Sequence, residues 1–410
     1  MHYRWMVFPF MGLLGFAQAA PLSFNAALDL AERASPDLSA QSASIAAAKS
    51  SAVAAGKLPD PKVFFGVDNL PVNGPDSWST SRDFMTMEKI GLMQDVPNSD
   101  RRHAQAAEAM AGIDEARGRR SIELNRIRRD AALAWIDRYY VEKRLALFDE
   151  LDRENRTLIE AVRAQVASNR SQPADIITPK EEAVQLADRR DDVVRDLAKS
   201  RAELGRFIGQ AADEPLAGIP PQLDIDPDRL RMHLHHHPDI AIFDSLTRKT
   251  EAEVREAEAA KESDWGVAVA YQRRSPLYSD MVSVQFTFDL PIFPETRQDP
   301  RIAAKKEELE KISAEKAAML RDHIAELEKD LADYAALGRQ LDRMNEISLP
   351  LSREKYDLDL SSYRAGRGRI EEVVNARQEW IEQRLKAIDL ESRKEQAAAR
   401  LRFAYGEDMQ

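Results

Sequence analysis

Cysteine is absent from all 410 residues of the sequence. Disulfides, thiolate metal sites, a cysteine nucleophile and a lipidated cysteine are therefore excluded. Glycine is also scarce, at 16 residues, which disfavours an all-β protein with many tight turns. The sequence has no HExxH motif, glycine-rich phosphate loop or nucleophile-and-base pattern. We therefore expect a protein that is not an enzyme and that needs no cofactor.

Long apolar runs are confined to the amino terminus. Residues 1–20 combine Arg4, an apolar stretch and a small-x-small site at Ala17–Ala19, which predicts a secretory signal peptide. No later segment has the roughly 18 apolar residues that a membrane-spanning helix needs. The net charge of −11 disfavours a nucleic-acid partner. We expect an exported protein that is periplasmic, secreted or in an outer membrane.

Four short segments are predicted to be strands, at about 62–70, 84–96, 264–273 and 281–290. Large apolar residues alternate with small or polar ones in the last two segments, at Trp265, Val267, Val269, Tyr271, Val282, Val284, Phe286 and Phe288. Because side chains on a strand point to opposite faces in turn, these eight residues share one face. They would contact lipid if the strands cross a bilayer, whereas in a soluble hairpin they would cover a core. In 84–96 the pattern is poorer, because Glu88 shares a face with Ile90 and Leu92.

The rest of the sequence is mostly long helix and falls into two similar halves. We expect a first repeat at 21–226, with long helices at about 99–167 and 174–208. The second repeat, at 227–410, would have long helices at about 300–362 and 370–405. Gly366 lies 197 positions after Asn169, and both residue types tolerate a left-handed turn. This correspondence indicates a tandem duplication.

The helix predicted at 300–362 has coiled-coil spacing. Its apolar residues recur every three or four positions, at Leu320, Ile324, Leu327, Leu331, Tyr334, Leu337, Leu341 and Met344. A 3.5-residue repeat of this kind keeps an apolar seam on a partner helix. Pro350 interrupts the helix, so we expect a kink or a boundary at 348–349.

Four strands cannot close a barrel, and each unpaired backbone group in lipid costs several kcal/mol. If the strands cross a membrane, several copies of the chain must therefore join to close one barrel. The same symmetry would arrange the long helices as a hollow cylinder. Its far end would lie at the helix turns, 168–173 and 364–369.

Several motifs resemble the TolC family of outer-membrane efflux proteins. They are Tyr363-x-x-Gly366, then Ile370-x-x-Val373-x-x-Ala376, and the terminal Leu401-x-x-x-Tyr405-Gly406. The resemblance implies a mainly α fold with a membrane β-barrel, built as a homotrimer with a 12-stranded barrel and a periplasmic α-helical barrel. It also implies docking to a periplasmic adaptor protein and an inner-membrane RND transporter, as the outer-membrane part of a tripartite efflux pump of a Gram-negative bacterium.

Residues 288–293, FDLPIF, resemble the heavy-metal efflux branch of the family, the CzcC/CusC-like proteins. This resemblance implies heavy-metal cations as the exported solutes. A type I secretion channel or a drug-efflux channel would have the same architecture. A periplasmic coiled-coil adaptor is a further alternative, although an adaptor normally lacks alternating strand pairs.

The resemblance also implies positions for a channel gate and for adaptor docking. The gate positions are Asp175, Tyr363, Glu372 and Asn375. The docking positions, at the helix-turn tips, are Asn169, Gly366, Arg367 and Gly368. Three copies of Glu372 around one axis would form an acidic ring that attracts cations. The alternative interpretation of Glu372 is a solvated helix carboxylate.

Four of the seven histidines lie between 233 and 237. Neutral imidazoles bind zinc, copper or nickel, but three consecutive residues cannot all face one ion on a regular helix. We therefore predict no metal site, with His235 and His237 as the candidates if one exists. Met85, Met87 and Met93 offer soft ligands, but methionine more often serves packing.

Overall fold

The computed structural model describes residues 21–405, so the predicted signal peptide and Gly406 lie outside the described residues. The chain forms two compact units. The hairpin unit contains the chain up to Ser35, Ile127–Ile225 and Asp330–Phe403. The sheet unit contains Pro36–Arg126, Asp226–Lys329 and the chain from Ala404. Each unit thus takes segments from both predicted repeats.

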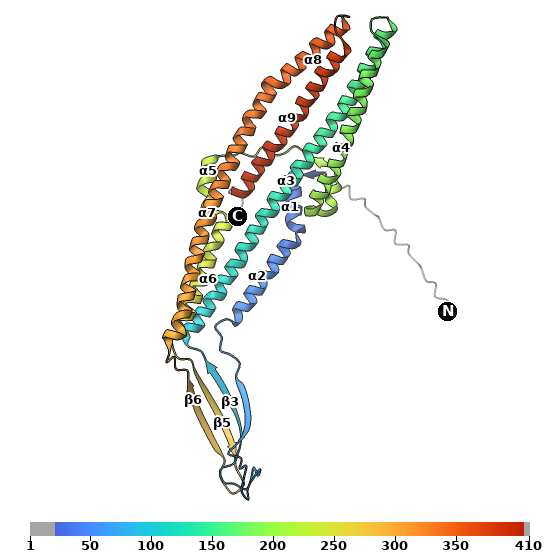
Figure 1. Ribbon diagram of the computed structural model, residues 1–410. Coiled ribbons are helices and arrows are strands. Elements are labelled where there is room, and N and C mark those ends of the chain that lie inside the picture. Colours follow the sequence, from blue (N-terminus) through green and yellow to red (C-terminus); the bar gives the residue numbers. More distant parts are fainter. Residues whose placement is uncertain (1–20, 406–410) are drawn as a thin grey trace, which may run out of the picture. The chain divides into compact units, whose positions relative to one another are not determined.

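The sheet unit contains a four-stranded antiparallel sheet, in which the strands lie in the order β2-β3-β5-β6 (Figure 1). Its strands are β2 (Lys62–Asp68), β3 (Met87–Val96), β5 (Trp265–Arg273) and β6 (Met281–Phe288). β3 pairs with β5, so the two hairpins join into one sheet although they lie far apart in the sequence. The unpaired edges of this sheet are β2 and β6.

The register gives the sheet two chemically different faces. Ile90 lies opposite Phe65 on β2 and Tyr271 on β5, and directly paired residues project to the same side of a sheet. One face is therefore apolar across all four strands. The other face is mostly small or polar, although Phe64 and Met93 also lie on it, and it includes Gly91, where a Cβ atom would lie 2.5 Å from the Phe64 ring and 2.6 Å from the Val269 carbonyl oxygen. A side chain larger than glycine would displace that ring.

The sheet unit also contains helices on either side of the strands in sequence. These are α2 (Pro36–Ala54), the first part of α3 (Ser99–Ala167), α5 (Pro227–His233), the short η3 (Leu234–His236), α6 (Pro238–Ala259) and, after η4 (Pro294–Thr296), the first part of α7 (Gln298–Arg343). Asn98 ties the start of α3 to the start of β5, because its side-chain amide donates to an Asp264 carboxylate oxygen at 3.0 Å. Its own oxygen accepts the Arg101 N–H and caps α3.

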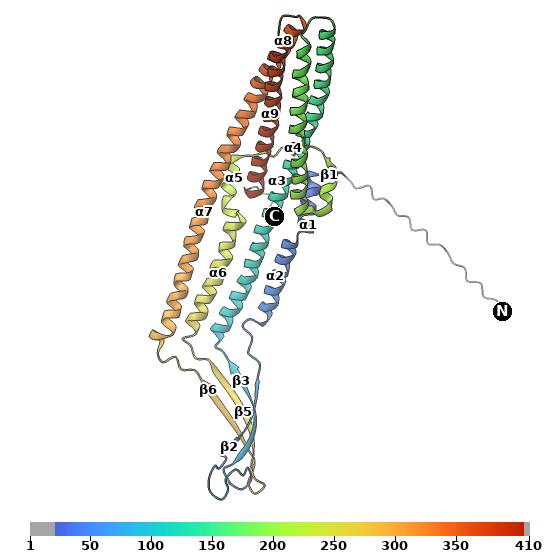
Figure 2. The same cartoon turned by 45° about the vertical axis from the view of Figure 1, so that its right-hand side comes forward.

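The hairpin unit is built from two long helical hairpins (Figure 2). The first joins the end of α3 to α4 (Ile177–Ile208) through η1 (Pro173–Ile176), and the second joins α8 (Leu349–Arg364) to α9 (Ile370–Tyr405). α1 (Phe24–Ala34), η2 (Gly209–Asp213) and the short parallel strands β1 (Leu22–Ser23) and β4 (Leu216–Ala217) complete the unit. Phe24 meets the buried Trp135 edge-on, with ring centroids 5.4 Å apart.

The helix predicted at 300–362 is interrupted close to Pro350. A π-helical turn, η5 (Met344–Ser348), separates α7 from α8, and Pro350 lies in the first turn of α8. The prediction of a boundary at 348–349 is confirmed, since proline removes a backbone donor and crowds the preceding turn.

The predicted apolar seam of α7 is only partly right. Leu327, Leu331 and Leu337 are buried, but Ile324 is 45% exposed and the side chain of its neighbour His323 is largely buried instead. A straight helix drifts from a strict 3.5-residue repeat, so a neighbouring position can take over the inward face.

No helix between residues 21 and 405 has an apolar stretch that is long enough to cross a membrane.

Candidate functional site

The two helix turns of the hairpin unit have the same backbone design. Asn169 and Gly366 both have left-handed φ angles, of 58° and 74°. The N–H group of the following residue then donates back to a carbonyl five positions earlier, from Arg170 to Gln165 at 2.9 Å and from Arg367 to Ser362 at 3.0 Å. This pattern ends a helix by the Schellman motif, which explains why asparagine and glycine occupy these positions.

An acidic side chain caps the helix that follows each turn. Asp175 accepts the Gln172 N–H at 3.0 Å, and Glu372 accepts the Arg369 N–H at 3.1 Å. Each acid lies at the third position of its helix and satisfies an otherwise unpaired backbone donor. Both predicted gate carboxylates therefore already have a local structural role within one chain.

Tyr363 is buried rather than exposed. Only 4% of Tyr363 is exposed, and it packs with Leu158, Val162, Ile370 and Val373. Its hydroxyl shares a 2.9 Å hydrogen bond with Ser171, which links the two turns. Burial raises the pKa of this hydroxyl. The resemblance implies a gate position for Tyr363, and within one chain its ring fills the space between the hairpins.

The other predicted gate and docking residues lie at the surface. Asn375, Asn169, Gly366 and Arg367 are exposed, and Gly368 is half-buried. A Cβ atom at Gly368 would lie 3.1 Å from the Tyr363 backbone nitrogen, which is closer than an ordinary contact. The glycine thus lets the chain pass close to the end of α8.

A buried polar network beyond the turns joins the two hairpins. The Arg377 guanidinium donates to Glu182 at 2.9 Å, to Asn155 at 2.7 Å and to the Leu151 carbonyl at 2.9 Å. Asn155 in turn donates to the Pro179 carbonyl at 2.9 Å. The network connects α3, α4 and α9 at one point.

This network is almost completely removed from solvent. The side chains of Arg377 and Glu182 are 0% and 2% exposed. Burial raises the pKa of Glu182, although Arg377 opposes that shift. Replacing a buried ion pair by apolar residues is often neutral or stabilising, so this pair is weak evidence for stability by itself.

Sequence reasoning missed this network, although a signal was present. Ile370, Val373, Arg377 and Ile381 recur at helical spacing on one face of α9, and all four are buried. An arginine within an apolar stripe predicts a buried partner, but the stripe itself does not say which acid supplies it.

The eight residues predicted to face lipid lie together on the apolar face of the sheet. Trp265, Val269, Tyr271, Val282, Val284, Phe286 and Phe288 are exposed in the single chain, and Val267 is half-buried. Val63, Phe65, Ile90 and Leu92 extend the same exposed face across β2 and β3. So large an apolar surface is unusual for a monomeric soluble protein.

Glu88 and Gln94 also lie on the apolar face, near the ends of β3. In the register, Glu88 lies opposite Arg273 and Gln94 opposite Val267. The polar residues therefore flank the apolar band, and the centre of β3 keeps Ile90 and Leu92.

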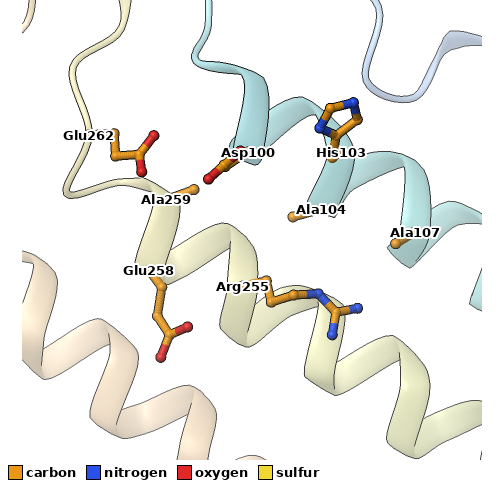
Figure 3. Close-up of a pocket in the computed structure, with 8 residues that line it drawn as sticks. All are labelled: Asp100, His103, Ala104, Ala107, Arg255, Glu258, Ala259 and Glu262. Atoms are coloured by element: carbon orange, nitrogen blue, oxygen red, sulfur yellow. The ribbon is translucent and has the colours of Figure 1, made fainter.

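A pocket of about 480 Å³ lies in the sheet unit between the start of α3 and the end of α6 (Figure 3). Its lining consists of the polar residues Asp100, His103, Arg255, Glu258 and Glu262 together with Ala104, Ala107 and Ala259. These side chains form no nucleophile-and-base arrangement, and among the described residues the grouped metal-ligating side chains lie elsewhere. The pocket carries no catalytic assignment.

Of the two histidines named as metal candidates, only His237 lies in a group of possible metal ligands. His237 is buried at the start of α6, where it lies near Asp239 and His323, whereas His235 is exposed and outside this group. His323 was not predicted, because it lies on α7, far away in the sequence.

Comparisons with known proteins give a fold and a match of part of the chain to a family model. Residues 232–407 match the outer membrane efflux protein family. No curated protein matches the chain. A membrane protein from Pseudomonas aeruginosa matches with a TM-score of 0.80 and 15% identity, over 93% of this chain and 90% of that chain.

Two further solved structures are similar. The outer membrane protein VceC from Vibrio cholerae gives a TM-score of 0.77 at 15% identity, over 94% of this chain and 97% of VceC. CusC gives 0.76 at 13% identity, over 93% of this chain and 92% of CusC. The chain therefore has the fold of these outer-membrane channel proteins, and residues 232–407 match the model of the outer membrane efflux protein family.

Proposed function

We propose that the protein is the outer-membrane channel of a tripartite efflux system. It lies in the outer membrane with a periplasmic extension, forms a homotrimer and conducts solutes passively. A periplasmic adaptor and an inner-membrane RND transporter supply its opening and the energy for transport. The match of residues 232–407 to the outer membrane efflux protein family supports this proposal.

The four-stranded sheet is the observation that carries the proposal. Its apolar face is exposed on every strand, and β2 and β6 each leave an edge without a partner in the sheet. Unpaired strand edges are not tolerated in lipid, so β6 of one chain must pair with β2 of the next. Three copies of four strands close a barrel with the apolar face outward and the mostly small and polar face inward.

The two hairpin turns have a different role from the sheet, namely docking to the adaptor and closure of the channel. Asn169, Gly366 and Arg367 project from the turns and are available to an adaptor, with Gly368 shaping the second turn. Glu372 and Asn375 are exposed just beyond the second turn and can line a constriction. Asp175 and Tyr363 hold the turns in place, through the cap on η1 and the bond to Ser171.

For the cargo we propose small solutes, and heavy-metal cations in particular. The FDLPIF run at 288–293 and the acidic position at Glu372 support this choice. The likeness to CusC concerns the fold alone at 13% identity. Drug efflux and type I secretion use the same architecture. Growth of a deletion strain of the host on zinc, copper or cadmium salts, compared with growth on a drug panel, separates these cargoes.

The test of the channel is conductance in planar bilayers, with wild type, Glu372→Gln and Glu371→Gln. We expect small, cation-selective currents that lose selectivity in Glu372→Gln. Glu371 is the matched control, because successive helix positions project about 100° apart and its carboxylate pairs with Arg369 at 3.3 Å. Selectivity that survives in Glu372→Gln discards the acidic ring and keeps the channel. A soluble elongated monomer that never inserts overturns the channel in favour of the adaptor.

A further inference from the structure

Two histidines and an aspartate from distant parts of the sequence meet in the sheet unit. One ligand atom from each of His237, Asp239 and His323 lies within 4.8 Å of the other two. His323 Nε2 is 3.3 Å from Asp239 Oδ2, and His237 Nδ1 is 3.7 Å from the same oxygen. The imidazole ring centroids are 4.2 Å apart. Donors from α7 and the start of α6 therefore converge on one point.

The spacing of these donors suits a small divalent cation. In a tetrahedral site with bonds of about 2.0–2.1 Å, neighbouring donor atoms lie roughly 3.4 Å apart. The distances from His323 Nε2 and His237 Nδ1 to Asp239 Oδ2, 3.3 and 3.7 Å, bracket this value. Two imidazole nitrogens and one carboxylate oxygen are a donor set for Zn²⁺, Co²⁺, Ni²⁺ or Cu²⁺, and not for Ca²⁺ or Mg²⁺.

Both imidazole side chains are mostly buried, so an ion bound between them would lie inside the protein. The side chains of His237 and His323 are 9% and 12% exposed. His323 Nδ1 is buried and has no hydrogen-bond partner within the described part of the chain. Tyr405 lies beside both imidazoles, with its ring centroid 5.6 Å from His237 and 6.2 Å from His323.

His237 has a second duty at the same place. Its Nδ1 accepts the Asp239 backbone N–H at 3.2 Å and so caps α6. Coordination through Nδ1 would exchange that capping bond for a bond to the metal, at the same helix end. An ion would then hold the start of α6 against α7 with stronger bonds than the cap supplies.

We propose that His237, Asp239 and His323 form a binding site for one divalent transition-metal ion per chain, with a solvent molecule as the fourth ligand. The ion clamps the start of α6 to α7. The site does not depend on which solute the channel exports, and it lies outside the gate and docking positions.

Titration of the untagged, full-length protein with Zn²⁺ and Co²⁺ tests this proposal. We expect one ion per chain, a visible Co²⁺ absorption typical of tetrahedral coordination, and a rise in melting temperature with Zn²⁺. His323→Gln and His237→Asn should each weaken binding by at least about tenfold. Asparagine is a favoured N-cap, so His237→Asn removes the imidazole and keeps the cap.

The matched control is the double variant His235→Asn with His236→Asn. Both residues are exposed near the cluster, and neither belongs to it. The control should bind Zn²⁺ and Co²⁺ as wild type does. Binding that is lost in the control and kept in His323→Gln would assign the metal to the exposed histidines and overturn the site. Wild-type protein that binds no ion at micromolar concentration would overturn it as well. Either result leaves the conductance test of the channel untouched.

Discussion

The buried side chain of Arg377 joins the two hairpins, and its burial carries a desolvation cost. It reaches α3 through Leu151 and Asn155 and α4 through Glu182, with almost no contact with solvent. Desolvating two charges costs several kcal/mol per ion, and their attraction repays this only when every hydrogen bond is made. Here Arg377 Nε and Glu182 Oε1 lack hydrogen-bond partners among the described residues, so the desolvation of both charged groups is only partly compensated.

At the residue scale, replacing one member of the pair should be far worse than replacing both. Glu182→Leu leaves the Arg377 charge buried and unpaired, and we expect it to lower the free energy of unfolding by about 3–5 kcal/mol. The double variant Glu182→Leu with Arg377→Met should recover most of this loss, because two apolar side chains of similar size need no partners. Chemical unfolding of the detergent-solubilised protein, followed by circular dichroism, measures both.

Equal losses in the single and double variants would contradict this expectation. Such a result would mean that the network stabilises the hairpin unit outright. The Asn155 amide group keeps its bond to the Pro179 carbonyl in both variants, but the double variant removes the Arg377 donor to the Asn155 oxygen, so a small part of the loss should remain.

At the element scale, the two turns share one backbone design, and the two glycines of the second turn are restricted for different reasons. A Cβ atom at Gly366 would meet nothing within 4 Å, so only the left-handed φ angle restricts that position. Asparagine already occupies the corresponding position of the other turn, at Asn169. At Gly368 the restriction is contact with Tyr363 and Ser362.

We therefore expect Gly366→Asn to be nearly neutral and Gly368→Ala to loosen the second turn. Trypsin reports this locally, because Arg364, Arg367 and Arg369 all lie at the turn. Cleavage there should speed up in Gly368→Ala and stay at the wild-type rate in Gly366→Asn. Gly366→Ala, with the left-handed strain of about 1–2 kcal/mol for a side chain that has no local polar group, is the intermediate case. Faster cleavage in Gly366→Asn than in Gly368→Ala would contradict the geometry.

The elements that sequence predicted are those set by local chemistry. The alternation in 264–273 and 281–290 places residues on opposite faces whatever the rest of the chain does. Pro350 ends a helix for a reason within its own turn. The left-handed turns at Asn169 and Gly366 likewise depend on those residues themselves.

What sequence did not predict depends on pairs that are far apart in the chain. The partner of Arg377 is Glu182, and the partner of His237 is His323. Neither pairing has a fixed spacing, because each is made only when separate helices pack. Tyr363 was predicted only as a gate residue, and its burial was not foreseen, since a motif gives a residue's place along the helix and not its packing.

At the scale of the whole molecule, the two faces of the sheet make opposite predictions for adjacent residues. Val284 is exposed on the apolar face, and Ser283 lies on the other. A lysine on the lipid side of a membrane strand costs about 2–4 kcal/mol near the midplane, whereas a lumen position tolerates it. Val284→Lys should therefore reduce the amount of trimer in the outer membrane, and Ser283→Lys should leave it unchanged.

The measurement is the yield of heat-dissociable trimer in purified outer membranes. Ser283→Lys is the control for added charge, because it changes the same strand at the next position. Similar yields for the two variants would place the sheet in water on both faces and remove the argument for membrane insertion.

The unpaired edges of β2 and β6 have a consequence for biogenesis. A newly exported chain carries an apolar surface and two open strand edges before it meets other copies, and such edges recruit further strands indiscriminately. Assembly must then compete with aggregation, and its rate should rise more steeply than linearly with the concentration of chains. In the proposed channel, the same sheet that seals the barrel would make each separate chain a client for periplasmic chaperones.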